Sequence, residues 1–115
     1  MIKPIRFLTK NDGKFGELKA LLPPDYELIR DATELHELQT DDMGALVRDK
    51  VLKAFRRIRR PLIVDHTGLA FDLLDGFPAG LTSMFYDKLK PEGIASLIGK
   101  STNKHVTAVT LIGYC

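Results

Sequence analysis

The fold is decided by the opening stretch Ile5-Arg6-Phe7-Leu8-Thr9-Lys10-Asn11-Asp12-Gly13-Lys14. Residues 5–9 are short and apolar, which predicts a buried strand, and the polar residues after them are typical of a turn. From Lys14 the apolar residues follow helical spacing, until Pro23-Pro24 stops the helix. Residues 26–29 then predict a second strand. A strand, a glycine-containing turn, a helix and a strand in this order indicate the start of a βαβ unit.

The rest of the chain continues to alternate between helical and strand-like spacing. The clearest helix spans residues 42–58, because its apolar residues fall three and four positions apart and form one stripe. A buried strand over residues 62–65 follows and ends in an acid, Asp65. We further expect a strand at 68–74, a loop at 75–80, short helices at 82–89 and 91–98, and a strand at 105–114. The pattern predicts a single α/β domain over residues 1–115, with a mixed twisted sheet flanked by helices.

Composition and charge exclude several classes of protein. The 115 residues are 44% hydrophobic and 28% charged, with a formal net charge of +2, which is an ordinary balance for a globular domain. A single cysteine, Cys115, allows neither a disulfide framework nor a Cys/His zinc site within the chain. No apolar run approaches the roughly 18–20 residues that span a bilayer. We interpret the basic residues 56–60 as a solvated helix end. The expectation is a cytoplasmic protein without nucleic-acid or membrane partners.

The first turn has the features of a phosphate-binding site. Open α/β sheets bind ligands at the carboxyl ends of strands, where loops lead into helix N-termini. Here Thr9 and Asn11 offer neutral donors, Lys10 and Lys14 add positive charge, and Gly13 allows close approach of the backbone. The glycine spacing is not that of a Walker motif. The residues alone leave two interpretations open, a phosphate cradle and an ordinary polar turn with exposed lysines.

The same turn resembles the Thr-Gly-Asn-x-x-Lys opening of the inosine triphosphate pyrophosphatase family. Thr9, Asn11 and Lys14 match this motif, and Lys10 replaces the glycine. The likeness continues in order along the chain. Residues 35–39 resemble the segment that carries the family's metal-binding glutamate, and Lys50 and Ala54 match the next family block. Residues 64–69 resemble the family's acidic strand end, residues 76–80 its Gly-x-Pro-Gly loop, and residues 85–93 its next pair of helices. The resemblance covers roughly residues 5 to 112.

The resemblance implies a hydrolase with a nucleotide-binding α/β fold. It would convert inosine, deoxyinosine or xanthosine triphosphate to the monophosphate and pyrophosphate, use Mg²⁺ or Mn²⁺, and work as a homodimer. Carried over position by position, the substrate-binding residues are Thr9, Asn11, Lys14 and Thr67, the metal ligands are Glu37 and Asp65, and the catalytic residues are Asp65 and His66.

Two departures from the family pattern bear on activity. The family has two consecutive acids at the strand end, whereas this chain has Asp65-His66. An imidazole is a poor ligand for Mg²⁺ but a suitable general base. Three readings follow: His66 replaces the acid as base, Asp65 supplies the carboxylate instead, or the site is weakened or inactive.

The second departure is length. The family's later motifs, which include a Ser-His-Arg segment that reads the purine base, do not occur in these residues. We therefore expect the chain to represent the N-terminal part of the family fold, either as a fragment or as a natural short form. A rival expectation is a nucleotide-binding or regulatory relative that has lost catalysis.

Overall fold

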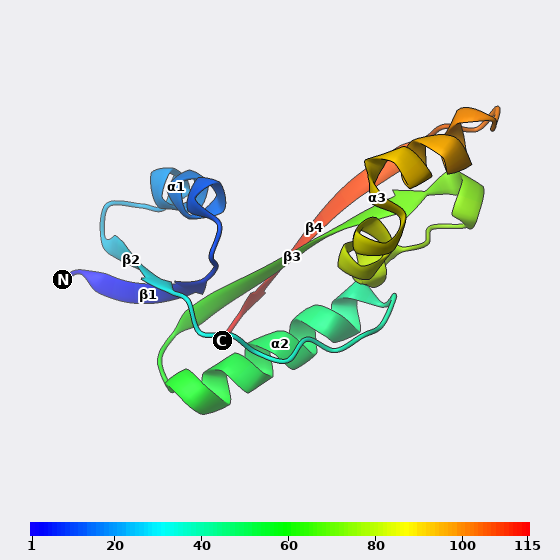
Figure 1. The fold of residues 1–115 in the computed structure, drawn as a ribbon. Helices are drawn as coiled ribbons and strands as arrows, with labels where there is room; N and C mark the ends of the chain where they lie inside the picture. The colour runs from blue at the N-terminus through cyan, green and yellow to red at the C-terminus, as the bar shows by residue number, and fades with distance from the viewer. The chain divides into compact units, whose positions relative to one another are not determined.

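The computed structural model describes residues 1–115 and shows a mixed sheet with helices on its faces (Figure 1). The elements are β1 (Lys3–Leu8), α1 (Asp12–Leu21), β2 (Tyr26–Asp31), α2 (Met43–Ile58), β3 (Leu62–Phe71), two short 3-10 helices (Asp72–Leu74 and Ala79–Leu81), α3 (Thr82–Gly99) and β4 (Val106–Tyr114). The sheet order is β2-β1-β3-β4, and β1 is parallel to both of its neighbours. The predicted α/β class with a mixed sheet is confirmed.

The chain forms two compact units. Unit 1 comprises Met1–Leu38, Val47–Asp65 and Ile112–Cys115, and unit 2 comprises Gln39–Leu46 and His66–Leu111. Three elements, α2, β3 and β4, run from one unit into the other. The description of the whole chain as one domain stays a prediction. None of the helices combines the length and the apolar character that crossing a bilayer requires.

In unit 1, α1 packs on one face of the sheet. The core on this side consists of Ile5, Phe7, Leu28 and Ile63, which are all buried. Phe15, Leu18 and Leu22 pack against it from α1 and its C-cap. These three residues are three and four positions apart, as the helical spacing in the sequence predicted. The packing holds α1 over β1, and with it the turn that joins them.

On the other face of unit 1, α2 covers β3. Leu62 and Val64 alternate with Ile63 along the strand and are fully buried. In unit 1, the buried positions of α2 are Val47, Val51 and Ala54, which belong to the predicted apolar stripe. The last residues of the chain lie beside them, because Leu62 and Cys115 exchange two backbone hydrogen bonds (2.9 and 3.1 Å). Such a reciprocal pair is characteristic of antiparallel strands.

The structure corrects the prediction that a strand ends at Asp65. β3 is continuous from Leu62 to Phe71, so the predicted strands at 62–65 and 68–74 form one strand, and the last three residues of the second prediction form a 3-10 helix instead. The acid appeared to end the strand, but β3 continues because it still has β4 as its neighbour in the sheet. Pairing with β1 places Phe7 opposite Ile63, so the end of β1 is level with the first residues of β3. Asp65 therefore lies beside the turn that follows β1.

Unit 2 contains two contacts between aromatic rings. The Phe85 ring lies 5.7 Å from the rings of Phe71 and Phe77, centroid to centroid. A close backbone approach requires glycine at position 68, where a Cβ would lie 2.5 Å from the carbonyl oxygen of Ala79. The predicted helices at 82–89 and 91–98 are the two halves of α3, which are separated by the non-helical backbone of Lys90 (φ 60°, ψ 170°).

Candidate functional site

The turn between β1 and α1 is held by its own side chains. Asn11 is the N-cap of α1, and its Oδ1 accepts a hydrogen bond from the Lys14 backbone N–H (3.0 Å). The Asn11 backbone N–H donates to Thr9 Oγ1 (3.0 Å), and the Thr9 backbone N–H donates to the carbonyl of Asp31 (3.1 Å). An asparagine at this position satisfies a donor that the first helical turn leaves open. The cap starts α1 at Asp12, two residues before the predicted start.

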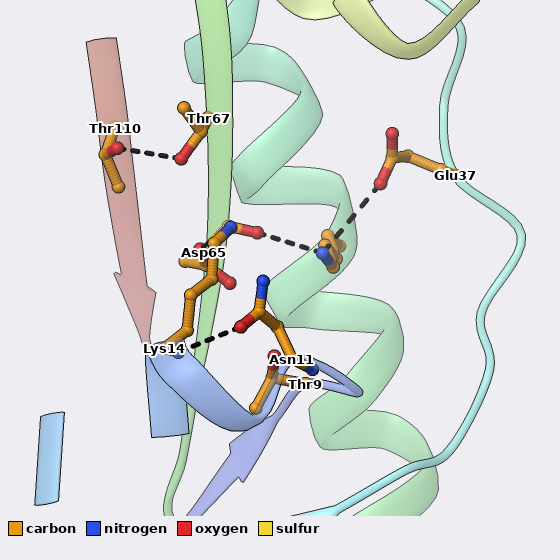
Figure 2. A network of polar contacts seen from close by, with 8 residues as sticks. Thr9, Asn11, Lys14, Glu37, Asp65, Thr67 and Thr110 are labelled. Atoms are coloured by element: carbon orange, nitrogen blue, oxygen red, sulfur yellow. Dashed lines mark hydrogen bonds and ion pairs between the residues drawn. The ribbon is translucent and has the colours of Figure 1, made fainter. Parts of the chain in front are cut away.

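Asp65 is the centre of a network of polar contacts (Figure 2). Lys14 Nζ donates to Asp65 Oδ2 at 2.7 Å, and Lys50 Nζ donates to the Asp65 backbone carbonyl at 2.9 Å. The Asp65 side chain is 11% exposed and the Lys14 side chain 38%. The two lysines reach Asp65 from α1 and from α2. Asp65 thus accepts hydrogen bonds from lysines of two helices, which lie on opposite faces of the sheet.

Glu37 extends this network. Its Oε2 lies 3.8 Å from Lys50 Nζ, which makes Lys50 the link between Asp65 and Glu37. Neither partner is fully exposed, because the Lys50 side chain is 20% exposed and that of Glu37 is 32%. The structure therefore brings Lys14, Asp65, Lys50 and Glu37 together in one chain of contacts within unit 1. Thr9 and Asn11 lie in the adjoining turn (Figure 2).

A cavity of about 340 Å³ adjoins the network and also lies in unit 1. Its size is in the range of small-molecule sites. The polar residues that line it are Thr9, Lys10, Asp31, Thr33, Glu34, Glu37 and Lys50. The charged members are three acids and two lysines, so the lining by itself has a slight negative excess. An anionic ligand therefore suits the cavity best when a cation accompanies it.

Asp31 is kept ionised by its neighbour in the loop after β2. Thr33 donates to Asp31 Oδ1 from its hydroxyl (2.5 Å) and from its backbone N–H (2.9 Å). These hydrogen bonds favour the charged form, so they lower the pKa of Asp31 below its usual value. The acid remains a negative charge in the cavity wall at neutral pH.

His66 and Thr67 follow Asp65 on β3 and belong to unit 2. Neighbouring side chains of a strand point to opposite faces, so His66 points away from the face that Asp65 shares with Thr67. His66 is 7% exposed, whereas Thr67 is exposed and its Oγ1 lies 2.8 Å from Thr110 Oγ1 (Figure 2). Because of this alternation, the side chains of Asp65 and His66, the two predicted catalytic residues, point to opposite faces of the sheet.

Lys50 matches the family pattern in the sequence analysis but was not predicted as a site residue. It lies on α2 beside the buried positions Val47, Val51 and Ala54. Its position at the edge of the apolar stripe could have identified it. At such a position the aliphatic part of a lysine side chain lies along the core and its ammonium group reaches the edge of the core. No group of three or more His, Cys, Asp and Glu side chains is arranged to hold a metal ion. Each of the predicted ligands Glu37 and Asp65 faces a lysine instead.

Known proteins share the sequence pattern and the fold. The sequence model described as the Ham1 family matches residues 5–115. "Inosine triphosphate pyrophosphatase 2" of Trypanosoma cruzi is 30% identical over 111 residues, which are 96% of this chain and 57% of that protein. The "dITP/XTP pyrophosphatase" of Methanopyrus kandleri is 29% identical over 112 residues, which are 96% of this chain and 60% of that protein. The chain thus spans less than two thirds of these relatives.

A solved structure agrees with the fold. The Ham1 protein of Staphylococcus aureus superimposes with a TM-score of 0.79 at 21% identity, over 98% of this chain and 63% of that one. At this identity the likeness concerns the fold alone.

Proposed function

This chain belongs to the Ham1 family, and from that premise we propose that it hydrolyses non-standard purine nucleoside triphosphates. The substrates are the triphosphates of inosine, deoxyinosine and xanthosine, and the products are the monophosphate and pyrophosphate. The names of the relatives support this substrate class. The observation that carries the proposal is the network of Lys14, Asp65, Lys50 and Glu37 beside the cavity, since it combines cations for phosphate with carboxylates for a metal ion and for water.

The triphosphate is bound by the turn after β1 and by two lysines. Lys14 and Lys50 supply positive charge, and both have carboxylate partners that a phosphate would replace. Asn11 caps α1 through Oδ1, so its side-chain N–H groups are the part of the amide that can donate to a phosphate. Thr9 lines the cavity beside them. In phosphoryl chemistry such positioning and charge compensation account for most of the catalysis.

Glu37 and Asp65 are the residues that would hold Mg²⁺ or Mn²⁺. Mg²⁺ is commonly bound by one or two carboxylates together with substrate phosphates rather than by a closed protein cage. Lys50 contacts the Glu37 carboxylate and the Asp65 backbone carbonyl, so both acids adjoin the same lysine. The negative excess of the cavity lining also suits a bound cation. A bound ion would neutralise phosphate charge and polarise a phosphoryl oxygen. Thr67, on the same strand face as Asp65, remains in the proposal as a substrate contact.

Asp65 is the proposed base toward the attacking water. Its side chain is largely buried, and Lys14 donates a hydrogen bond that orients its carboxylate. Of the three readings of Asp65-His66, strand alternation favours the one in which Asp65 supplies the carboxylate. His66 as a base stays the alternative, because a neutral imidazole nitrogen can accept a proton from water.

The proposal also covers the localisation and the oligomeric state of the protein. We expect a cytoplasmic homodimer that contains the N-terminal part of the family fold. Support comes from the family resemblance and from the single cysteine, which is typical of chains in reducing compartments. Light scattering after size exclusion would show twice the chain mass of 12.9 kDa for a dimer.

Pyrophosphate release from a panel of triphosphates tests the proposal. We expect Mg²⁺-dependent release from the triphosphates of inosine, deoxyinosine and xanthosine, and much slower release from those of adenosine and guanosine. The matched control is Lys19→Ala, which removes a lysine from α1 outside the network and should leave the rates unchanged.

The second candidate function is nucleotide binding without catalysis. His66 favours it, since it stands where the family pattern has an acid. Calorimetric binding of inosine triphosphate without release of pyrophosphate would support this candidate and contradict hydrolysis.

A further inference from the structure

Lys10 is a cation that the family pattern does not have. It stands at the position of the glycine in Thr-Gly-Asn-x-x-Lys, one residue after Thr9. Its side chain lines the same cavity as Lys50 and Glu37. Lys10 Nζ forms an ion pair with Glu34 Oε1, which lies in the loop after β2 and also lines the cavity. The pair therefore joins the two loops that border the cavity.

The Lys10–Glu34 pair is open to exchange. The Lys10 side chain is 61% exposed and that of Glu34 is 77%. Ion pairs between exposed side chains contribute little stability, because water screens both charges and two flexible side chains have to be ordered. A triphosphate presents several negative charges close together and attracts an ammonium group more strongly than one exposed carboxylate does. The lysine can change partners at little cost.

We propose that Lys10 is a triphosphate-binding residue of this chain and that Glu34 competes with the ligand for it. This inference rests on the proposed function and deepens it. When a triphosphate enters the cavity, Lys10 leaves Glu34 and contacts a phosphate oxygen, so that three lysines rather than two surround the ligand. Glu34 then sets the affinity, since the ligand has to displace it.

Calorimetric binding of inorganic tripolyphosphate tests this, with Mg²⁺ and ionic strength held constant. Tripolyphosphate isolates the phosphate contacts from any contact with a purine. We expect Lys10→Ala to weaken binding about fivefold, the size of one exposed charge contact. Lys19→Ala removes the same charge from the exposed side of α1 and is expected to change nothing. Because Lys10 is exposed, its replacement should leave the thermal unfolding curve unchanged.

A double-mutant cycle separates competition from a general charge effect. Glu34→Gln should tighten binding about threefold where Lys10 is present, because it releases the lysine. In the Lys10→Ala background Glu34→Gln should gain nothing. An equal gain in both backgrounds would show that Glu34 acts through its own charge and would overturn the proposal, as would unchanged binding by Lys10→Ala.

Failure of this inference differs from failure of the proposed function. If the wild-type protein binds both tripolyphosphate and inosine triphosphate while Lys10→Ala binds them equally well, only the role of Lys10 is wrong. If the wild-type protein binds neither, both the proposed function and the role of Lys10 are overturned.

Discussion

Asp65 is the residue on which the proposed chemistry depends most, because both lysines of the network meet at it. Its carboxylate receives the Lys14 ammonium and its backbone carbonyl receives the Lys50 ammonium. When Lys14 moves to a phosphate, the carboxylate loses its partner next to the reacting group. The same residue can then hold a metal ion or accept a proton from water.

Replacement of Asp65 and His66 separates their roles. Asp65→Asn keeps the shape of the side chain and removes its charge, so we expect kcat for inosine triphosphate to fall at least about 100-fold. His66→Asn alters a buried side chain on the opposite strand face and should lower the unfolding temperature while kcat stays within about tenfold. Steady-state kinetics and thermal unfolding of both variants check this. A larger loss of kcat for His66→Asn than for Asp65→Asn would assign the base to histidine.

Among the elements, α1 links stability to binding through its N-cap. Asn11→Ala removes the side-chain acceptor for the Lys14 N–H, which should lower the free energy of unfolding by about 1 kcal/mol and also weaken triphosphate binding. Asn11→Asp is the matched variant, because aspartate caps helices equally well but has no side-chain N–H and adds negative charge. It should retain stability and lose affinity, as measured by urea unfolding and calorimetry. Wild-type affinity in Asn11→Asp would remove Asn11 from the binding site.

The packing of α2 against β3 depends on Gly113 at the end of β4. A Cβ at this position would lie 2.9 Å from Val47 Cγ1 and 3.1 Å from Val64 Cγ2. Gly113→Ala should therefore destabilise the protein by about 1–3 kcal/mol through overpacking. Gly16→Ala is the control, since nothing lies within 4 Å of a Cβ at Gly16 and alanine favours the helix interior by roughly 0.5–1 kcal/mol. Urea unfolding of the two variants should show shifts of opposite sign, and a stabilised Gly113→Ala would contradict the described packing.

The elements also show what the sequence could predict. The opening β1, α1 and β2 follow from local signals, because the period of the apolar residues changes at the turn and the prolines end the helix. The full length of β3 was not predictable from its own residues, since the neighbouring strand in the sheet sustains it beyond Asp65. The place of Lys50 in the site was missed for a similar reason: its contact with Asp65 depends on how α2 packs across β3.

At the scale of the whole molecule, the groups proposed to hold the triphosphate belong to one compact unit, with the exception of Thr67, which belongs to the other. Thr9, Asn11, Lys14, Lys50 and Asp65 all lie in Met1–Leu38 and Val47–Asp65, as does the cavity. The formal charge of the chain is only +2, so affinity for a triphosphate has to come from this local arrangement rather than from a general positive field. We therefore expect binding to depend on the lysines of the site and on a divalent cation.

The measurement that tests the central claim most directly is phosphorus NMR of the protein incubated with inosine triphosphate and Mg²⁺. The predicted result is loss of the triphosphate resonances with equal appearance of inosine monophosphate and inorganic pyrophosphate, and no such change in Asp65→Asn. Unchanged triphosphate, or conversion to the diphosphate and orthophosphate, would contradict the account.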